Sequence, residues 1–205
     1  MRKRTLHKKK SIRIGLYGAG MQGHTQTMAI SELFDIEEVR VYDTSKKATE
    51  TYKKNMRSTV KGTIKIAATP EEAASGDAVI TVTQSKDKFL KDHWIGPGTI
   101  VFPMGSYQEC EDDLILNADK IIVDHIDQCL HRGALKELVD RQRFGSEDIH
   151  ATIGELAAGK KDGRDSTSER VVCIPIGTGA MDVAIGTVVL QRAYEQDLGG
   201  RFSFV

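Results

Sequence analysis

The stretch IRIGLYGAGMQG constrains this chain most, because an apolar segment of strand length ends there in three glycines, Gly18, Gly20 and Gly23. A helical pattern follows these glycines directly. The spacing GxGxxG between a strand and a helix is typical of a turn that holds the pyrophosphate of a dinucleotide. Free backbone N–H groups and the helix dipole favour an anion at that point. The stretch therefore predicts a dinucleotide-binding unit.

Each glycine has a predicted task. Gly18 permits the tight turn, Gly20 lets the backbone approach the pyrophosphate, and Gly23 lets the helix pack closely on the strand. The intervening residues complete the predicted cofactor loop, and they are Ala19, Met21 and Gln22. The alternative is a glycine-rich strand–helix turn that binds no ligand.

Asp43 supplies the second half of this pattern, twenty residues after Gly23 and at the end of the next apolar segment. A carboxylate there accepts hydrogen bonds from ribose hydroxyls and repels a 2′-phosphate, so we expect NAD rather than NADP. Thr44 is placed beside it at the same site. Lys46 and Lys47 keep NADP as an alternative, since they offer partners to a phosphate. Asp43 as a plain turn former is the other alternative.

Short apolar segments alternate with helical stretches over the first 125 residues, which predicts an α/β fold with a Rossmann-type, doubly wound parallel sheet. Strands are expected at 11–17, 38–43, 63–68, 77–83, 98–104 and 119–124, and helices at 22–34, 45–57, 69–76 and 129–143. We expect a basic leader at 1–11, an NAD-binding domain at 12–145, and at 146–205 a small helical and strand extension packing on it.

Ligands sit at the carboxyl ends of the strands in such a sheet, so the loops after the fourth and fifth strands are candidates for the nicotinamide side. The candidates there are Thr83, Gln84, Ser85, Met104, Gly105 and Ser106. Each of these can equally be an ordinary loop residue. Asp124 and His125 end the sixth strand near the same edge.

Composition narrows the partners. The formal net charge is zero, which argues against a dedicated nucleic-acid binder, although the first ten residues, MRKRTLHKKK, are basic. We expect no membrane span, because no apolar run is long enough. Cys110, Cys129 and Cys173 are far apart in the sequence, so we expect reduced structural thiols, no metal site and a cytoplasmic location.

From Ile12 onward the chain resembles the ornithine cyclodeaminase/μ-crystallin family. The resemblance is carried by GLYGAGMQGHTQ, VRVYD, TVTQSKDK and GSYQECEDDL, and most specifically by GELAAGKKDGRDS and GTGAMD near the C-terminus. It implies NAD-linked chemistry on a small α-amino or α-imino acid, with hydride passing between the α-carbon and the nicotinamide.

The resemblance also implies a separate substrate domain. Family members carry this domain before the glycine motif, where it binds the substrate carboxylate, but only eleven residues precede Ile12 here. We therefore expect an NAD-binding subunit of an oxidoreductase or cyclodeaminase, in a homo- or hetero-oligomer, with a second polypeptide carrying the substrate domain. That domain would dock on an exposed apolar surface formed partly by C-terminal segments. The alternatives are a catalytically inactive NAD-binding regulatory or structural module, and a fragment of a longer protein.

The catalytic assignments come from the same resemblance. The family's catalytic aspartate lies two residues past a glycine like Gly105, and Tyr107 occupies that position here. Tyrosine is a poor acid or base at neutral pH without tuning. Glu109 is the substitute if the loop shifts, or else a solvated loop carboxylate. Gly177 is expected to let its turn approach the cofactor or the sheet. Asp182 matches an acidic family residue that caps the last helix or holds the nicotinamide end.

Overall fold

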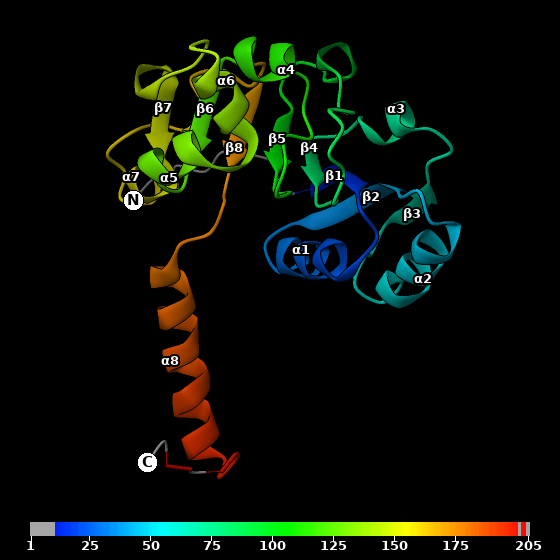
Figure 1. The fold of residues 1–205 in the computed structure, drawn as a ribbon. Helices are drawn as coiled ribbons and strands as arrows, with labels where there is room; N and C mark the ends of the chain where they lie inside the picture. Colours follow the sequence, from blue (N-terminus) through cyan, green and yellow to red (C-terminus); the bar gives the residue numbers. More distant parts are fainter. Residues whose placement is uncertain (1–10, 201, 204–205) are drawn as a thin grey trace.

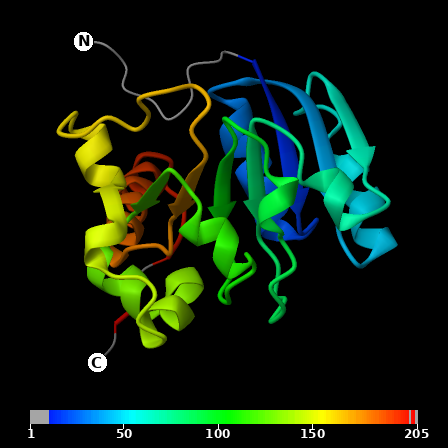
Figure 2. The ribbon, with the colours of Figure 1, turned by 90° about the horizontal axis from the view of Figure 1, so that it is seen from above.

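The computed structural model describes residues 11–200, 202 and 203, so the expected leader at 1–11 lies outside the described residues except for Ser11. One sheet of eight strands runs through the described chain in the order β3-β2-β1-β4-β5-β8-β6-β7. Every strand pair in it is parallel, and Figure 2 shows the strands lying side by side. The expected α/β fold with a Rossmann-type parallel sheet is confirmed.

The element bounds follow the sequence pattern closely in the first half. The strands are β1 Ser11–Tyr17, β2 Asp35–Tyr42, β3 Thr63–Ile66, β4 Ala78–Thr81, β5 Ile100–Pro103, β6 Lys120–Val123, β7 Ile149–Thr152 and β8 Val171–Ile174. The α-helices are α1 Met21–Ser31, α2 Lys46–Met56, α3 Pro70–Ala73, α4 Asp112–Leu116, α5 Ile126–His131, α6 Lys136–Asp140, α7 Ile153–Ala157 and α8 Gly179–Glu195. Residues 11–200 also form three short 3-10 helices, which are η1 Asp92–Trp94, η2 Gly133–Leu135 and η3 Ser146–Asp148.

Side-chain caps fix where several helices begin. The Ser45 hydroxyl accepts a hydrogen bond from the Ala48 N–H at the start of α2. Thr69 caps α3 in the same way, with Pro70 at the first helical position. Such hydroxyls satisfy N–H groups that the first turn leaves without a helical partner.

Helix α1 is fixed to α2 by a buried polar contact. The hydroxyls of Thr27 in α1 and Tyr52 in α2 are 2.6 Å apart, and both residues are fully buried. Burial raises the pKa of the Tyr52 phenol to about 12, so it is a neutral hydrogen-bonding group at physiological pH. This contact, together with the apolar cluster that contains Leu16, Val39 and Tyr52, fixes the helix that follows the glycine turn.

The structure differs from the expected boundary at residue 145. Strands β7 and β8 belong to the same sheet as the first six, and β8 lies between β5 and β6. All four residues of β8 are buried, and Val171 pairs with Ile100 on one side and with Lys120 on the other. The segment through Ile174 is therefore an integral part of the sheet rather than an extension packed on it.

The single helix expected at 129–143 is also interrupted. Helix α5 ends at His131, and η2 and α6 follow it. The cause is local: Arg132 is extended at φ −153°, and Gly133 has a φ of +73°, which favours glycine. Strand β7, with the sequence IHAT, was not expected at all.

Helix α8 extends away from the rest of the molecule (Figure 1) and contains no buried residue. Its exposed large apolar side chains are Met181, Val183, Ile185, Val188, Val189, Leu190 and Tyr194. A helix with apolar residues on all sides is normally covered by other structure. This is the exposed apolar surface that the sequence led us to expect among the C-terminal segments.

Candidate cofactor site

The glycine turn between β1 and α1 is constrained by its neighbours. Gly18 has a φ of +101°, and a Cβ added there would lie 2.7 Å from the Val82 carbonyl oxygen. A Cβ on Gly23 would lie 2.2 Å from the Gly18 carbonyl oxygen. At Gly20, by contrast, an added Cβ would meet nothing within 4 Å. The turn is thus tight at its two ends and open at its middle glycine.

Gly20 lies directly before the first residue of α1. Gly20 is the N-cap of this helix of eleven residues and provides no side-chain cap, and Met21 and Gln22 are exposed beside it. An uncapped helix start presents N–H groups to whatever lies in front of it. This geometry suits an anion such as a pyrophosphate.

Asp43 is brought against this turn from the end of β2. One carboxylate oxygen accepts a hydrogen bond from the Ala19 N–H at 2.8 Å, and the other accepts one from the Ser45 N–H at 2.8 Å. An ionised carboxylate offers about four lone-pair sites, so acceptor capacity is left for two ribose hydroxyls. Thr44 and Lys46 are exposed next to it.

Glu109 joins the loops that follow β4 and β5. Its side chain is fully buried. Oε1 accepts hydrogen bonds from the Thr83 N–H at 2.9 Å and the Thr83 hydroxyl at 2.5 Å. Oε2 accepts from the Thr81 hydroxyl at 2.6 Å and the Gly105 N–H at 3.0 Å. The interpretation of Glu109 as a solvated loop carboxylate is therefore wrong, because its partners enclose it.

The other predicted residues of these two loops are placed as follows. The Thr83 hydroxyl accepts a hydrogen bond from the Ser85 N–H, while Gln84 is exposed. The Met104 N–H donates to the Thr81 carbonyl, which aligns the start of the second loop with β4. Ser106 is exposed beyond it.

Tyr107 lies in a different environment from Glu109. Its side chain is 46% exposed, and the Lys86 ammonium lies 5.7 Å from the centre of its ring. A cation over the ring face is attracted by the aromatic quadrupole. Of the two residues considered for proton transfer, Tyr107 is the one that solvent and a ligand can reach.

A second carboxylate organises the ends of β6 and β8. Asp124 accepts hydrogen bonds from the Gly177 N–H at 2.6 Å and the His125 N–H at 2.9 Å. Gly177 has a φ of +88°, as its turn requires. The sequence placed Asp124 at this edge, but the Gly177 contact joins residues 53 apart and has no local signal. His125 caps α5 through a ring nitrogen that accepts from the Gln128 N–H.

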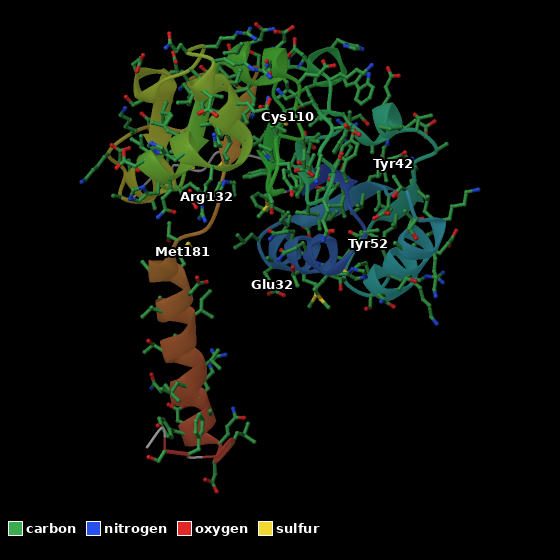
Figure 3. The ribbon with its side chains drawn as sticks, viewed as in Figure 1. Glu32, Tyr42, Tyr52, Cys110, Arg132 and Met181 are labelled. Atoms are coloured by element: carbon green, nitrogen blue, oxygen red, sulfur yellow. The ribbon has the colours of Figure 1, made fainter. Side chains whose placement is uncertain are left out.

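Asp182 lies in the first turn of α8, beside an open hollow between that helix and α5. Arg132 and His131 line the same hollow, and Figure 3 shows Arg132 above Met181. Arg132 was missed by sequence reasoning, although a guanidinium beside a predicted ligand edge is a group that binds carboxylates. Thr178 is the N-cap residue of α8, but its side chain accepts no hydrogen bond from the first turn of the helix.

The three cysteines are buried free thiols. Burial raises the pKa of the Cys129 thiol to about 11 and that of the Cys173 thiol to about 12, and it raises the pKa of Cys110 further. Among the described residues, no group of three or more His, Cys, Asp or Glu side chains could hold a metal ion. No helix in the described part of the chain is long and apolar enough to cross a membrane.

A parallel sheet with a glycine turn after β1 and an acidic residue after β2 defines the dinucleotide-binding class of α/β proteins. Within that class, the chain belongs to the ornithine cyclodeaminase/mu-crystallin family, whose model matches residues 2–197. The family resemblance inferred from the sequence motifs is confirmed.

Two relatives show how far the similarity extends. The chain is 34% identical over 202 residues to an alanine dehydrogenase of Archaeoglobus fulgidus, covering 97% of this chain and 62% of that protein. A solved archaeal alanine dehydrogenase dimer with bound NAD superposes with a TM-score of 0.89 at 34% identity, covering 99% of this chain and 63% of the other.

A third relative comes from another enzyme type. The Thermococcus litoralis Δ1-pyrroline-2-carboxylate reductase, solved with NADH and L-proline, has a TM-score of 0.89 at 25% identity, covering 95% of this chain and 62% of the other. The chain thus spans slightly less than two thirds of the length of these relatives.

Proposed function

We propose that this chain is the NAD-binding part of an amino-acid or imino-acid oxidoreductase or cyclodeaminase, and that a second polypeptide supplies the substrate domain. One observation carries the cofactor assignment: the Asp43 carboxylate is hydrogen-bonded to the Ala19 N–H inside the glycine turn. The acidic residue and the turn are therefore in direct contact, which supports a single cofactor site. Related structures solved with NAD or NADH support the assignment.

The cofactor would be held along the carboxyl edge of the sheet. The pyrophosphate would lie on the N-terminus of α1, in the space left open at Gly20. Asp43 would accept hydrogen bonds from the adenosine ribose, which favours NAD over NADP. The nicotinamide would lie at the loops that contain Thr83 and Gly105. When bound, NAD supplies the hydride acceptor or donor.

The names of the relatives bear on the substrate class. They include alanine dehydrogenase, Δ1-pyrroline-2-carboxylate reductase and N-((2S)-2-amino-2-carboxyethyl)-L-glutamate dehydrogenase. Alanine and Δ1-pyrroline-2-carboxylate are a small α-amino acid and a small cyclic α-imino acid, and the third compound is a larger, N-substituted α-amino acid. We therefore assign α-amino or α-imino acids, and small ones first, as the substrate class of the complete enzyme. Tyr107 would handle the proton at the substrate nitrogen or water, because it is exposed at the edge of the sheet.

Helix α8 supports the two-chain proposal. Its apolar side chains are exposed on every side, so a partner must surround it rather than pack on one face. The occupant we propose is the substrate domain, because the match covers only 62% of the alanine dehydrogenase that the chain resembles. A second copy of this chain is the other outcome of the test.

The test compares the full chain alone with the chain co-expressed with a polypeptide carrying the family's substrate domain. Alone, it should bind NAD without oxidising alanine, proline or ornithine, and the pair should turn over one of them. Tyr107→Phe should lower the turnover of the pair without changing its NAD affinity. Turnover by the chain alone would contradict the two-chain proposal. Self-association through α8 with no binding of the second polypeptide would contradict the proposed occupant.

The inactive regulatory module predicts a different result. In that case Tyr107→Phe has no effect in any complex, because no proton transfer depends on the phenol. The variant therefore separates an enzyme from a module with the same cofactor.

A further inference from the structure

Glu109 is a buried carboxylate with no Lys or Arg partner among the salt bridges of the described residues. Four hydrogen bonds replace such a partner, two on each oxygen. Burying a carboxylate is costly unless its oxygens accept hydrogen bonds, and these four hydrogen bonds offset that cost.

Three of the four donors belong to the two loops of the predicted nicotinamide side, and the fourth is the hydroxyl of Thr81, the last residue of β4. Thr83 is the second residue of the loop after β4, and Gly105 is the second residue of the loop after β5. The backbone carbonyl of Glu109 also accepts from the Phe89 and Leu90 N–H groups, both at 3.0 Å. One residue thus fixes the first loop at both of its ends and fixes it to the second loop.

The Glu109 carboxylate lies close to the backbone of Gly105. A Cβ added at Gly105 would lie 2.4 Å from Glu109 Oε2. A side chain at position 105 would therefore push the Glu109 carboxylate out of this position.

We infer that Glu109 is a positioning residue that holds the Thr83 and Gly105 loops in the arrangement that receives the nicotinamide half of the cofactor. It does so as a four-fold acceptor and takes no part in proton transfer. This inference rests on the proposed function, since it concerns the same NAD site.

The variant Glu109→Gln isolates the acceptor role. The side chain keeps its size, but one oxygen becomes an NH2 group, which is a donor. The two hydroxyls can reorient, but each carboxylate oxygen also faces one backbone N–H, that of Thr83 or that of Gly105. In either orientation of the amide, its NH2 group lies against one of these two backbone N–H donors. The hydrogen bond that fixes that loop to residue 109 is then lost.

The experiment measures the affinities of the full chain for NAD and for ADP-ribose, which lacks the nicotinamide. Glu109→Gln should raise the Kd for NAD about tenfold and that for ADP-ribose less than about threefold, because only the nicotinamide-side loops are released. A uniform loss of structure would raise the Kd values for NAD and ADP-ribose by the same factor. Glu111→Gln is the matched control, since this partly exposed carboxylate lies nearby and should change neither Kd.

Thr81→Val is the second variant, and it carries the test if Glu109→Gln does not fold. It removes one hydrogen bond from within buried β4 and should shift the same affinity ratio by a smaller factor. Equal weakening of both ligands, or no change in either variant, would overturn the inference. If the unaltered chain binds neither ligand, the proposed function itself fails, and the inference falls with it.

Discussion

At the residue scale, we propose that Asp43 sets the preference of the site for NAD over NADP. Its carboxylate is held by two backbone N–H groups and lies where an adenosine ribose would be bound. Asp43→Asn keeps the shape but removes the charge, so the Kd for NAD should rise about tenfold and the preference over NADP should narrow. Calorimetric titration measures both. Asp35→Asn, at the opposite end of β2, is the control. An unchanged NAD affinity in Asp43→Asn would contradict the assignment.

The three cysteines make a second prediction at this scale. Because burial raises the pKa values of Cys129 and Cys173 to about 11 and about 12, both are neutral thiols at pH 8. We expect a disulfide reagent to react slowly with the native chain and to titrate three thiols after unfolding. Rapid reaction of any thiol in the native state would show that its surroundings open.

At the element scale, two glycines of the turn into α1 should have different roles: Gly23 in stability and Gly20 in NAD binding. Gly23→Ala places a Cβ against the Gly18 carbonyl and should cost about 1–3 kcal/mol of unfolding free energy. The methyl group of Gly20→Ala meets no atom, so stability should be nearly unchanged. NAD binding should weaken, because the methyl group would occupy the space that we propose for the pyrophosphate. Thermal unfolding and NAD titration of the two variants check this. Equal effects on both quantities would argue against the separation.

Helix α4 provides a pH prediction at the same scale. A hydrogen bond from the Lys88 ammonium, aided by Gln108, lowers the pKa of Asp112. A lowered pKa in the folded state means that Asp112 stabilises the chain above its ordinary pKa of about 3.9 and loses this contribution as the pH falls below it. We expect Asp112→Asn to be less stable than the parent near pH 7 and the difference to shrink toward pH 3. Asp113→Asn, an exposed neighbour, should show no such trend.

Sequence patterns predicted the elements with local signals. The apolar segment before Gly18, the cap at Ser45 and the acidic end of β2 were all readable, because each depends on neighbouring residues. The position of β8 was not, since it depends on pairing Val171 with Ile100 and Lys120 across long stretches of chain. The burial of Glu109 was likewise hidden, because three of its four donors come from Thr81 and Thr83, which are 28 and 26 residues away.

At the scale of the whole molecule, the sheet and α8 are contrasting parts. The sheet buries its strands between layers and assembles the predicted cofactor residues along one edge. Helix α8 leaves its apolar surface uncovered and extends away from that edge (Figure 1). This contrast is what we expect of a cofactor-binding part whose active site is completed by further structure.

Equilibrium binding of NAD to the full chain tests this account most directly. Calorimetry at neutral pH should show one NAD bound per chain, with NADP bound more weakly because Asp43 repels its 2′-phosphate. Failure to bind either dinucleotide, or tighter binding of NADP than of NAD, would contradict the account.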